Sequence, residues 1–182
     1  GVMSEKLAAS YILIGPPGSG KSTIGKALAK SLGVKFSDTD SLIEAEVAMP
    51  ISQIFIDKGE PWFREVEARI VAREIEQANG VLSLGGGAPL SEIAQKAIKS
   101  SSAKIVYLDI SLSAAAPRVG FNRDRPLLLN NPRAAWQALM EKRRPIYLSL
   151  ATQVILVDNL SPREIVEAII SGNEISEDKV GQ

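Results

Sequence analysis

The sequence predicts an α/β fold in which a five-stranded parallel sheet lies between two layers of helices. Two observations predict this three-layer α-β-α arrangement. Short apolar runs alternate along the chain with stretches of helical periodicity, and the first run leads directly into a glycine-rich loop and a helical pattern. Strands that are apolar throughout favour a parallel sheet with helices on both faces. The chain has 182 residues, 45% of them apolar, which suits one domain, expected at residues 1–172.

The expected strands are short apolar runs, and the expected helices are longer stretches with apolar residues at helical spacing. Strands are predicted at residues 11–14, at a short run ending near 36–37, and at 81–84, 103–108 and 154–157. Helices are predicted at residues 22–32, 40–47, 61–77, 91–99, 111–119, 132–150 and 162–171. Pro132 and Pro162 support the last two helices, because proline is favoured in the first helical turn.

Composition excludes several kinds of site and partner. The chain has no cysteine and no histidine, which excludes thiolate metal sites, a cysteine nucleophile and histidine acid–base chemistry. Lys plus Arg and Asp plus Glu both number 21, which argues against a nucleic-acid or membrane surface. No apolar run reaches the roughly 18 residues of a membrane-spanning helix. We expect a cytoplasmic monomer, with residues 1–2 left from an expression vector and residues 173–182 forming a disordered tail.

A phosphate-binding loop is the clearest functional motif. Residues 15–22 match G-x-x-x-x-G-K-S between a predicted strand and a predicted helix, which is the context that a P-loop requires. In such a loop, backbone N–H groups and the helix N-terminus bind phosphate, while the lysine reaches the terminal phosphates and the serine ligates Mg²⁺. The sequence therefore predicts a site for a nucleoside triphosphate with Mg²⁺, formed by Gly18, Ser19, Gly20, Lys21, Ser22 and Thr23.

Aspartates and glycines follow the next two predicted strands, where ligands of an open α/β sheet collect. Asp38 and Asp40 are one residue apart, so both carboxylates point to one side of an extended segment and suit a metal or a hydroxyl. Helix capping by Asp40 is the structural alternative, and it would explain only one of the two. The glycines Gly85, Gly86 and Gly87 allow the backbone to approach a ligand closely, although a flexible turn would also explain them.

Arginines form a third candidate group, because the guanidinium fork suits recognition of a carboxylate. Arg64 lies three residues before Glu67, which could hold its guanidinium in place, and Arg143 lies in a predicted helix. A solvated helix face is the alternative for each arginine taken singly. Residues 120–131 are polar and predicted to be mobile, and arginines in or near this stretch could close over the P-loop or be solvated surface: Arg118, Arg123 and Arg125.

These motifs occur in an order that is similar to a known family. The set comprises the P-loop, Asp38-Thr39-Asp40, Gly59-Glu60 with Phe63-Arg64 and Glu67, Leu84-Gly85-Gly86-Gly87, Arg125-Pro126-Leu127, and Arg143 with Pro145-Ile146-Tyr147. Over about residues 11–162 the chain resembles the shikimate kinases, which are nucleoside-monophosphate-kinase-like P-loop enzymes with a mobile lid. The resemblance implies that ATP with Mg²⁺ phosphorylates the 3-hydroxyl of shikimate in aromatic amino-acid (chorismate) biosynthesis, giving shikimate 3-phosphate and ADP.

The resemblance also implies roles on the nucleotide side. Lys21 would contact the ATP phosphates as a catalytic residue, and Ser22 would bind Mg²⁺ with Asp38 assisting through water. Arg118 and Pro162 would lie beside the adenine. Arg125, a further catalytic residue, would come down onto the phosphates with a lid at about residues 118–131.

On the substrate side, the resemblance implies binding by helices within about residues 40–78. Asp40 would accept hydrogen bonds from the shikimate hydroxyls and is the candidate catalytic base. Arg64 and Arg143 would clamp the carboxylate. The remaining contacts would come from two aromatic rings and from the backbone of the glycine loop: Phe55, Phe63, Gly85, Gly86 and Gly87.

Other functions stay open from the residues alone. A gluconate-type kinase or a nucleotide kinase of the same fold is one class, and a catalytically silent ATP-binding relative is another. The aspartates and arginines suit a hydroxylated acid better than a nucleobase, and the complete set of charged residues argues against a silent relative. Two departures from the family pattern affect the nucleotide side: a short loop at residues 157–162, and Asp124 beside Arg125.

Overall fold

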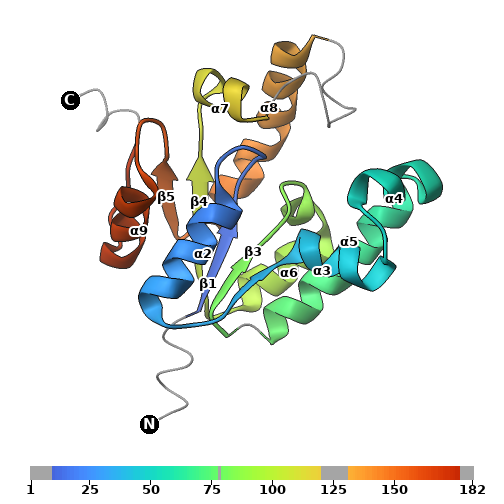
Figure 1. The fold of residues 1–182 in the computed structure, drawn as a ribbon, viewed down its shortest axis with the longest axis horizontal. Helices are drawn as coiled ribbons and strands as arrows, with labels where there is room; N and C mark the ends of the chain where they lie inside the picture. Colours follow the sequence, from blue (N-terminus) through green and yellow to red (C-terminus); the bar gives the residue numbers. More distant parts are fainter. Residues whose placement is uncertain (1–9, 78, 120–130, 177–182) are drawn as a thin grey trace.

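Five parallel strands form the centre of the protein in the computed structural model, which describes residues 10–77, 79–119 and 131–176 (Figure 1). Their order across the sheet is β2-β3-β1-β4-β5, and every neighbouring pair is parallel. The predicted parallel sheet is confirmed, and the strand ends differ from prediction by one residue at most. The strands are β1(Tyr11–Ile14), β2(Phe36–Asp38), β3(Val81–Ser83), β4(Lys104–Asp109) and β5(Gln153–Leu156).

The first strand is central because it can be buried on both faces. All four residues of β1 are buried, and Tyr11 lies opposite Val81 on one side and Lys104 on the other. At the sheet edge, by contrast, β2 is only half-buried throughout. The loop after β1 therefore starts from the middle of the sheet, between the loops that follow β3 and β4.

Helices cover both faces of the sheet, as the alternating pattern predicted (Figure 1). On one face, α2(Lys21–Leu32) packs against α9(Pro162–Ser171) and against β3. On the other face, α5(Glu60–Glu76), α6(Glu92–Ser100) and α8(Pro132–Leu150) pack in succession. The short helix α7(Leu112–Val119) packs on α8, and α3(Thr39–Val47) packs on α5.

The sequence did not predict the helix α4(Ile51–Lys58) or the 3₁₀ turn η1(Ala88–Leu90). Pro50 precedes α4 and Gly59 ends it, so that the helix has only about two turns, too short to be stable alone. Its stability comes from tertiary packing: Ile54 joins a small second core with residues of α3 and α5. Together α3, α4 and α5 occupy the region predicted to bind substrate.

The end of the described chain is ordered, which corrects the predicted disordered tail at its first residues. Ile175 pairs with Ile155 of β5, and the Leu156 N–H donates to the Ile175 carbonyl at 2.8 Å. The Gln153 amide also donates to the Asn173 carbonyl at 2.6 Å. Residues 177–182, residues 1–2 and most of the expected lid lie outside the described residues. Within the described residues, no helix is both long and apolar enough to cross a membrane.

Candidate active site

The P-loop follows β1, and its three glycines have backbone conformations that other residues rarely adopt, with φ 147° at Gly15. Gly18 and Gly20 have φ values of 85° and 91°, in the left-handed region. Gly20 is also the N-cap of α2, and no described side chain caps that helix. The first N–H groups of α2 therefore face the loop without a side-chain acceptor, and with the helix dipole they form an anion-binding N-terminus.

The Lys21 side chain lies over this loop. Its Nζ donates hydrogen bonds to the carbonyls of Gly15 at 2.7 Å and Pro16 at 3.0 Å. The buried Ser19 hydroxyl donates to the same Pro16 carbonyl at 2.8 Å and stiffens the turn. The ammonium group is thus held beside the helix N-terminus, where a bound phosphate would meet both.

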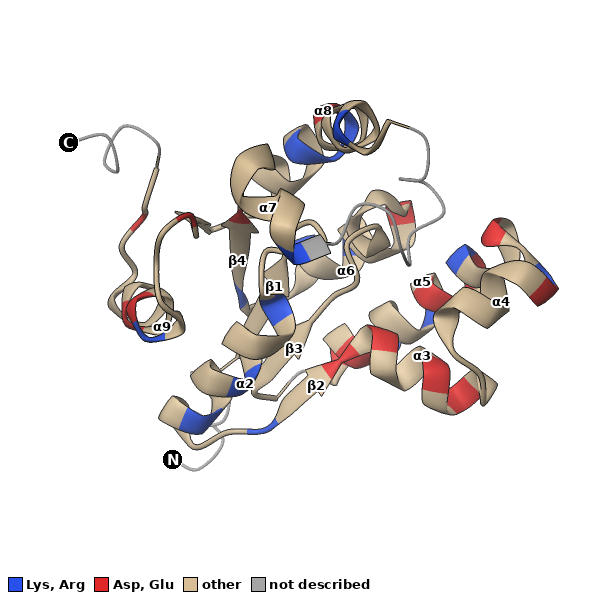
Figure 2. Ribbon diagram, turned by 45° about the horizontal axis from the view of Figure 1, so that its top comes forward, with Lys and Arg blue, Asp and Glu red and all other residues tan. Residues whose placement is uncertain are grey.

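Asp38 connects the P-loop helix to α3. Its Oδ2 accepts a hydrogen bond from the Ser22 hydroxyl at 2.6 Å, and its Oδ1 accepts from the Asp40 N–H at 2.8 Å. Asp38 is therefore the N-cap of α3. The alternative interpretation of the sequence, in which Asp40 caps this helix, is wrong. Figure 2 shows these acidic positions at the β2–α3 junction, and basic positions at the start of α2 and the end of α7.

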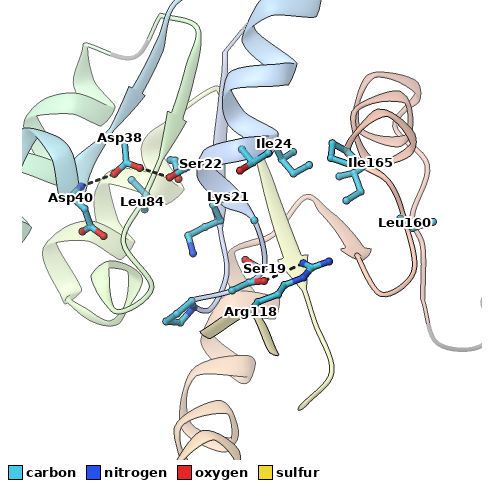
Figure 3. Close-up of a pocket in the computed structure, with 16 residues that line it drawn as sticks. Ser19, Lys21, Ser22, Ile24, Asp38, Asp40, Leu84, Arg118, Leu160 and Ile165 are labelled. Carbon is cyan, nitrogen blue, oxygen red and sulfur yellow. Dashed lines mark hydrogen bonds between the residues drawn. The ribbon is translucent and has the colours of Figure 1, made fainter. Parts of the chain in front are cut away.

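A cavity of about 440 Å³ runs along the P-loop (Figure 3). Its polar part is formed by the loop, Asp38 and Asp40, and its apolar part includes Ile24, Leu160 and Ile165. Arg118 and Pro162, both expected near the adenine, also line it. The Arg118 guanidinium reaches over the loop and donates to the Gly18 carbonyl at 3.2 Å. A polar end beside an apolar end fits the phosphates and the base of a nucleotide.

The glycine loop after β3 packs against three different charged side chains. A Cβ on Gly85 would lie 2.6 Å from Asp40 Oδ1, and a Cβ on Gly86 would lie 3.0 Å from Arg143 Nη1. A Cβ on Gly87 would lie 2.5 Å from Nη1 of Arg64. None of the three glycines has a positive φ. A Cβ at any of the three positions would therefore press on a charged side chain, so the loop lies in close contact with all three groups.

Arg64 is fixed in place by its neighbours, as its spacing from Glu67 predicted. Its Nη1 lies 2.8 Å from Glu67 Oε1, and its guanidinium lies 5.2 Å from the centre of the Phe63 ring. Phe55 packs on Phe63 with ring centroids 4.8 Å apart. An arginine fork and an aromatic face thus lie together beside the glycine loop.

Glu67 joins these charges below the loop, where only 3% of it is exposed. Burial raises the pKa of Glu67 above its ordinary value of 4.5, although the Arg64 guanidinium acts in the opposite direction. Asp40 adds a smaller upward effect on this pKa, and Arg143 a smaller downward one. Arg64, Arg143 and Asp40 lie on three different helices, and all three are therefore close enough to affect the charge on Glu67.

The glycine loop also touches the P-loop. A Cβ on Gly86 would lie 3.2 Å from Pro17 Cδ and 3.5 Å from the Gly15 carbonyl. The P-loop and the glycine loop are therefore parts of one site. Of the residues expected there, Arg125 lies outside the described residues. Phe55 and Phe63 pack together beside Arg64, and the others line the cavity or belong to or contact the glycine loop.

Comparison with known proteins decides the family. The sequence profile described as shikimate kinase matches residues 17–173. This chain belongs to the shikimate kinase family. The resemblance stated from the motifs is therefore confirmed, and the enzyme is an ATP-dependent small-molecule kinase.

Individual relatives agree with the family assignment. A shikimate kinase from Salinispora arenicola is 46% identical over 159 residues, covering 87% of this chain and 94% of that protein. Among solved structures, the shikimate kinase from Acinetobacter baumannii in complex with shikimate has a TM-score of 0.86 at 30% identity, covering 92% of this chain and 94% of that one. A gluconokinase from Sinorhizobium meliloti has a TM-score of 0.52 at 20% identity, covering 92% of each chain, which shows a shared fold alone.

Two residues of this shikimate kinase site were given no role from the sequence. Thr39 is fully buried, and its hydroxyl accepts a hydrogen bond from the Gly85 N–H at 3.1 Å. The Tyr147 hydroxyl donates to the Gly86 carbonyl at 2.6 Å. Thr39 carried no sequence signal apart from its place between two aspartates. Tyr147 was part of the family motif, but nothing local indicated its partner 61 residues away.

Proposed function

We propose that the enzyme transfers the γ-phosphoryl group of ATP to the 3-hydroxyl of shikimate, giving shikimate 3-phosphate and ADP for aromatic amino-acid synthesis. The observation that carries this proposal is the position of Gly86, which lies close to both Arg143 and Pro17 of the P-loop. A carboxylate held by the arginine would therefore place its molecule beside the phosphate-binding loop. The shikimate bound in the Acinetobacter baumannii relative supports the choice of acid.

ATP would be bound by positive charge that the fold already places at the P-loop. The N–H groups at the start of α2 and the Lys21 ammonium would hold the transferring phosphate and stabilise its developing negative charge. The apolar side of the cavity, with Pro162, would take the adenine beside Arg118. Arg125 keeps its proposed role as a lid residue that closes onto the phosphates.

Ser22 and Asp38 suit a magnesium ion. Mg²⁺ binds through one or two protein oxygens and keeps waters and phosphate oxygens as its other ligands. The Ser22 hydroxyl and the Asp38 carboxylate, which lie within hydrogen-bond distance, match that sparse ligand set. When bound, the ion neutralises charge on the β- and γ-phosphates. We propose that Ser22 ligates it directly and Asp38 through water.

The residues around the glycine loop would orient shikimate, the acceptor of the phosphoryl group. Arg64 and Arg143 would bind the carboxylate through their planar forks, which position a ligand as well as attract it. The Phe55–Phe63 pair would pack against the ring. Asp40 would accept a hydrogen bond from the reacting hydroxyl and take its proton as the new P–O bond forms and ADP leaves. Phosphoryl transfer through a loose transition state needs little more than this positioning.

An ADP-release assay with magnesium and ATP tests the proposal, comparing shikimate, gluconate, quinate and AMP as acceptors. We expect turnover with shikimate to exceed turnover with each of the others, and Lys21→Ala to lower kcat. Preferred turnover with gluconate or AMP would replace the proposed acceptor. ADP release that is no faster with any acceptor than without one would indicate a silent relative.

We also propose that the enzyme acts as a monomer. Among the described residues, the exposed large apolar side chains lie on four different helices: Ile56, Ile93, Leu148 and Ile170. Light scattering during size-exclusion chromatography should therefore give a mass near 19.5 kDa. Twice that mass across a dilution series would contradict the proposal.

A further inference from the structure

Tyr147 contacts the glycine loop, residues 85–87, through its hydroxyl group. It lies on α8 with no exposed surface, and its hydroxyl donates a 2.6 Å hydrogen bond to the Gly86 carbonyl. Gly86 has no side chain through which packing could hold it. The hydrogen bond from Tyr147 is therefore a direct restraint on the orientation of this peptide unit.

That restraint acts on the next N–H group. The Gly86 carbonyl and the Gly87 N–H belong to one planar peptide unit, and no described peptide bond is cis. In a trans unit the two groups point in opposite directions. By holding the carbonyl, Tyr147 turns the Gly87 N–H away from α8. Gly87 is the residue that packs against the Arg64 guanidinium, which is an expected carboxylate ligand.

The same hydroxyl lies beside Arg143, one helical turn earlier on α8. Burial raises the pKa of Tyr147 to about 12, while the Arg143 guanidinium acts in the opposite direction. The hydroxyl therefore stays protonated near neutral pH and remains a donor. Because a Cβ on Gly86 would lie 3.0 Å from Arg143 Nη1, the tyrosine, the arginine and the glycine form one contact group.

A second tyrosine holds the ring of the first. The rings of Tyr107 and Tyr147 are 4.9 Å apart at their centroids, and Tyr107 is also fully buried. The Tyr107 hydroxyl donates to Asp109 at 2.8 Å, and Asp109 pairs with Arg144 at 2.7 Å. Within the described part of the chain, no hydrogen bond or ion pair joins these three polar groups to the glycine loop. The two tyrosines thus have similar burial but different partners.

We propose that Tyr147 is a positioning residue that, through its hydrogen bond to the Gly86 carbonyl, aims the Gly87 N–H at the carboxylate end of the acceptor substrate. This rests on the proposed function, because shikimate is taken as the acceptor. The hydroxyl does not touch the substrate. It acts through the peptide unit, and it contributes to acceptor binding and not to ATP binding.

The test compares Tyr147→Phe with Tyr107→Phe as the matched control. Each variant loses one buried hydroxyl and keeps its ring, so we expect similar decreases in thermal midpoint. Tyr147→Phe should raise the KM for shikimate roughly fivefold to tenfold, the scale of one lost hydrogen bond, with the KM for ATP unchanged. Tyr107→Phe should leave both KM values within about twofold. Equal changes in the shikimate KM for the two variants, or none in Tyr147→Phe, would overturn the proposal.

A readout that needs no turnover separates this proposal from the proposed function. The backbone amide resonance of Gly87 in the ¹⁵N-labelled enzyme should shift in Tyr147→Phe and remain in place in Tyr107→Phe. An unmoved Gly87 resonance in Tyr147→Phe would overturn the positioning role whatever the substrate is. If that resonance shifts but the wild-type enzyme does not phosphorylate shikimate, the restraint stands and the assigned acceptor fails.

Discussion

Gly87 and Arg64 pack so closely that a Cβ on the glycine would lie 2.5 Å from Nη1 and 2.8 Å from Nη2 of the arginine. Gly87 has φ −90° and ψ −8°, which any residue can adopt, so a larger residue would be opposed by the Arg64 side chain and not by backbone strain. The Arg64 guanidinium can move, but only by leaving the position in which Glu67 holds it at 2.8 Å. The glycine thereby determines where the arginine fork lies.

Gly87→Ala should therefore raise the KM for shikimate about tenfold, because the displaced Arg64 loses hydrogen bonds to the carboxylate. The KM for ATP should not change. Gly33→Ala is a suitable control: position 33 has φ 68° and no neighbouring atom within 4 Å of a Cβ. It should cost about 1 kcal/mol of unfolding free energy and leave both KM values alone. Steady-state kinetics and denaturant unfolding measure these effects, and an unchanged shikimate KM in Gly87→Ala would contradict the prediction.

Arg143→Ala should raise the KM for shikimate about a hundredfold, because a buried charged contact to the ligand is lost. Only 6% of Arg143 is exposed, beside Gly86. The neighbouring Arg144, whose side chain is 43% exposed, pairs with Asp109, and Arg144→Ala should change the shikimate KM little. Initial rates over a grid of both substrates check this. Loss of ATP and shikimate affinity together in Arg143→Ala would show that the arginine is structural.

Two substitutions at Asp38 should separate its role as the N-cap of α3 from its proposed role in binding Mg²⁺. Asparagine is as good an N-cap as aspartate, so Asp38→Asn should keep α3 stable while raising the Mg²⁺ concentration needed for half-maximal activity. Asp38→Ala should raise the Mg²⁺ requirement and also cost about 1 kcal/mol of unfolding free energy. Magnesium titrations and thermal unfolding measure both effects. If Asp38→Asn needs no more Mg²⁺ than the wild-type enzyme, the proposed metal role is wrong.

Because of Glu67, the unfolding free energy should fall as pH rises while the affinity for shikimate increases. Its pKa is raised in the folded state, mainly by burial, so the folded protein binds more protons than the unfolded chain between pH 4.5 and the raised pKa. The unfolding free energy should fall as pH rises through this window. The shikimate KM should fall over the same window, since ionised Glu67 holds Arg64 more firmly.

Thermal unfolding and kinetics between about pH 4 and pH 7 test this with two variants. Glu67→Gln should lose the part of the pH dependence of both quantities that Glu67 contributes. Glu60→Gln, which removes a more exposed carboxylate 3.8 Å from Arg64, should keep it. A wild-type unfolding curve that parallels that of Glu67→Gln across the window would refute the assignment.

Local patterns in the sequence predicted the strands, most of the helices and the P-loop. Apolar runs and helical periodicity lie within contiguous residues, and the G-x-x-x-x-G-K-S loop sets its own backbone geometry between Gly15 and Ser22. The pairing of Arg64 with Glu67 was also predicted, because three residues separate them on one helix. The order of motifs indicated the family, which the comparisons confirmed.

Only the tertiary structure decided contacts between distant segments. It made Asp38 the cap of α3, stabilised α4 through a second core, and ordered residues 173–176 along β5. It packed Gly87 against the Arg64 guanidinium, and it brought Tyr147 to the Gly86 carbonyl. The physical reason is that periodicity reports which face of an element is buried. It does not report which element covers that face, because this depends on the order of strands in the sheet.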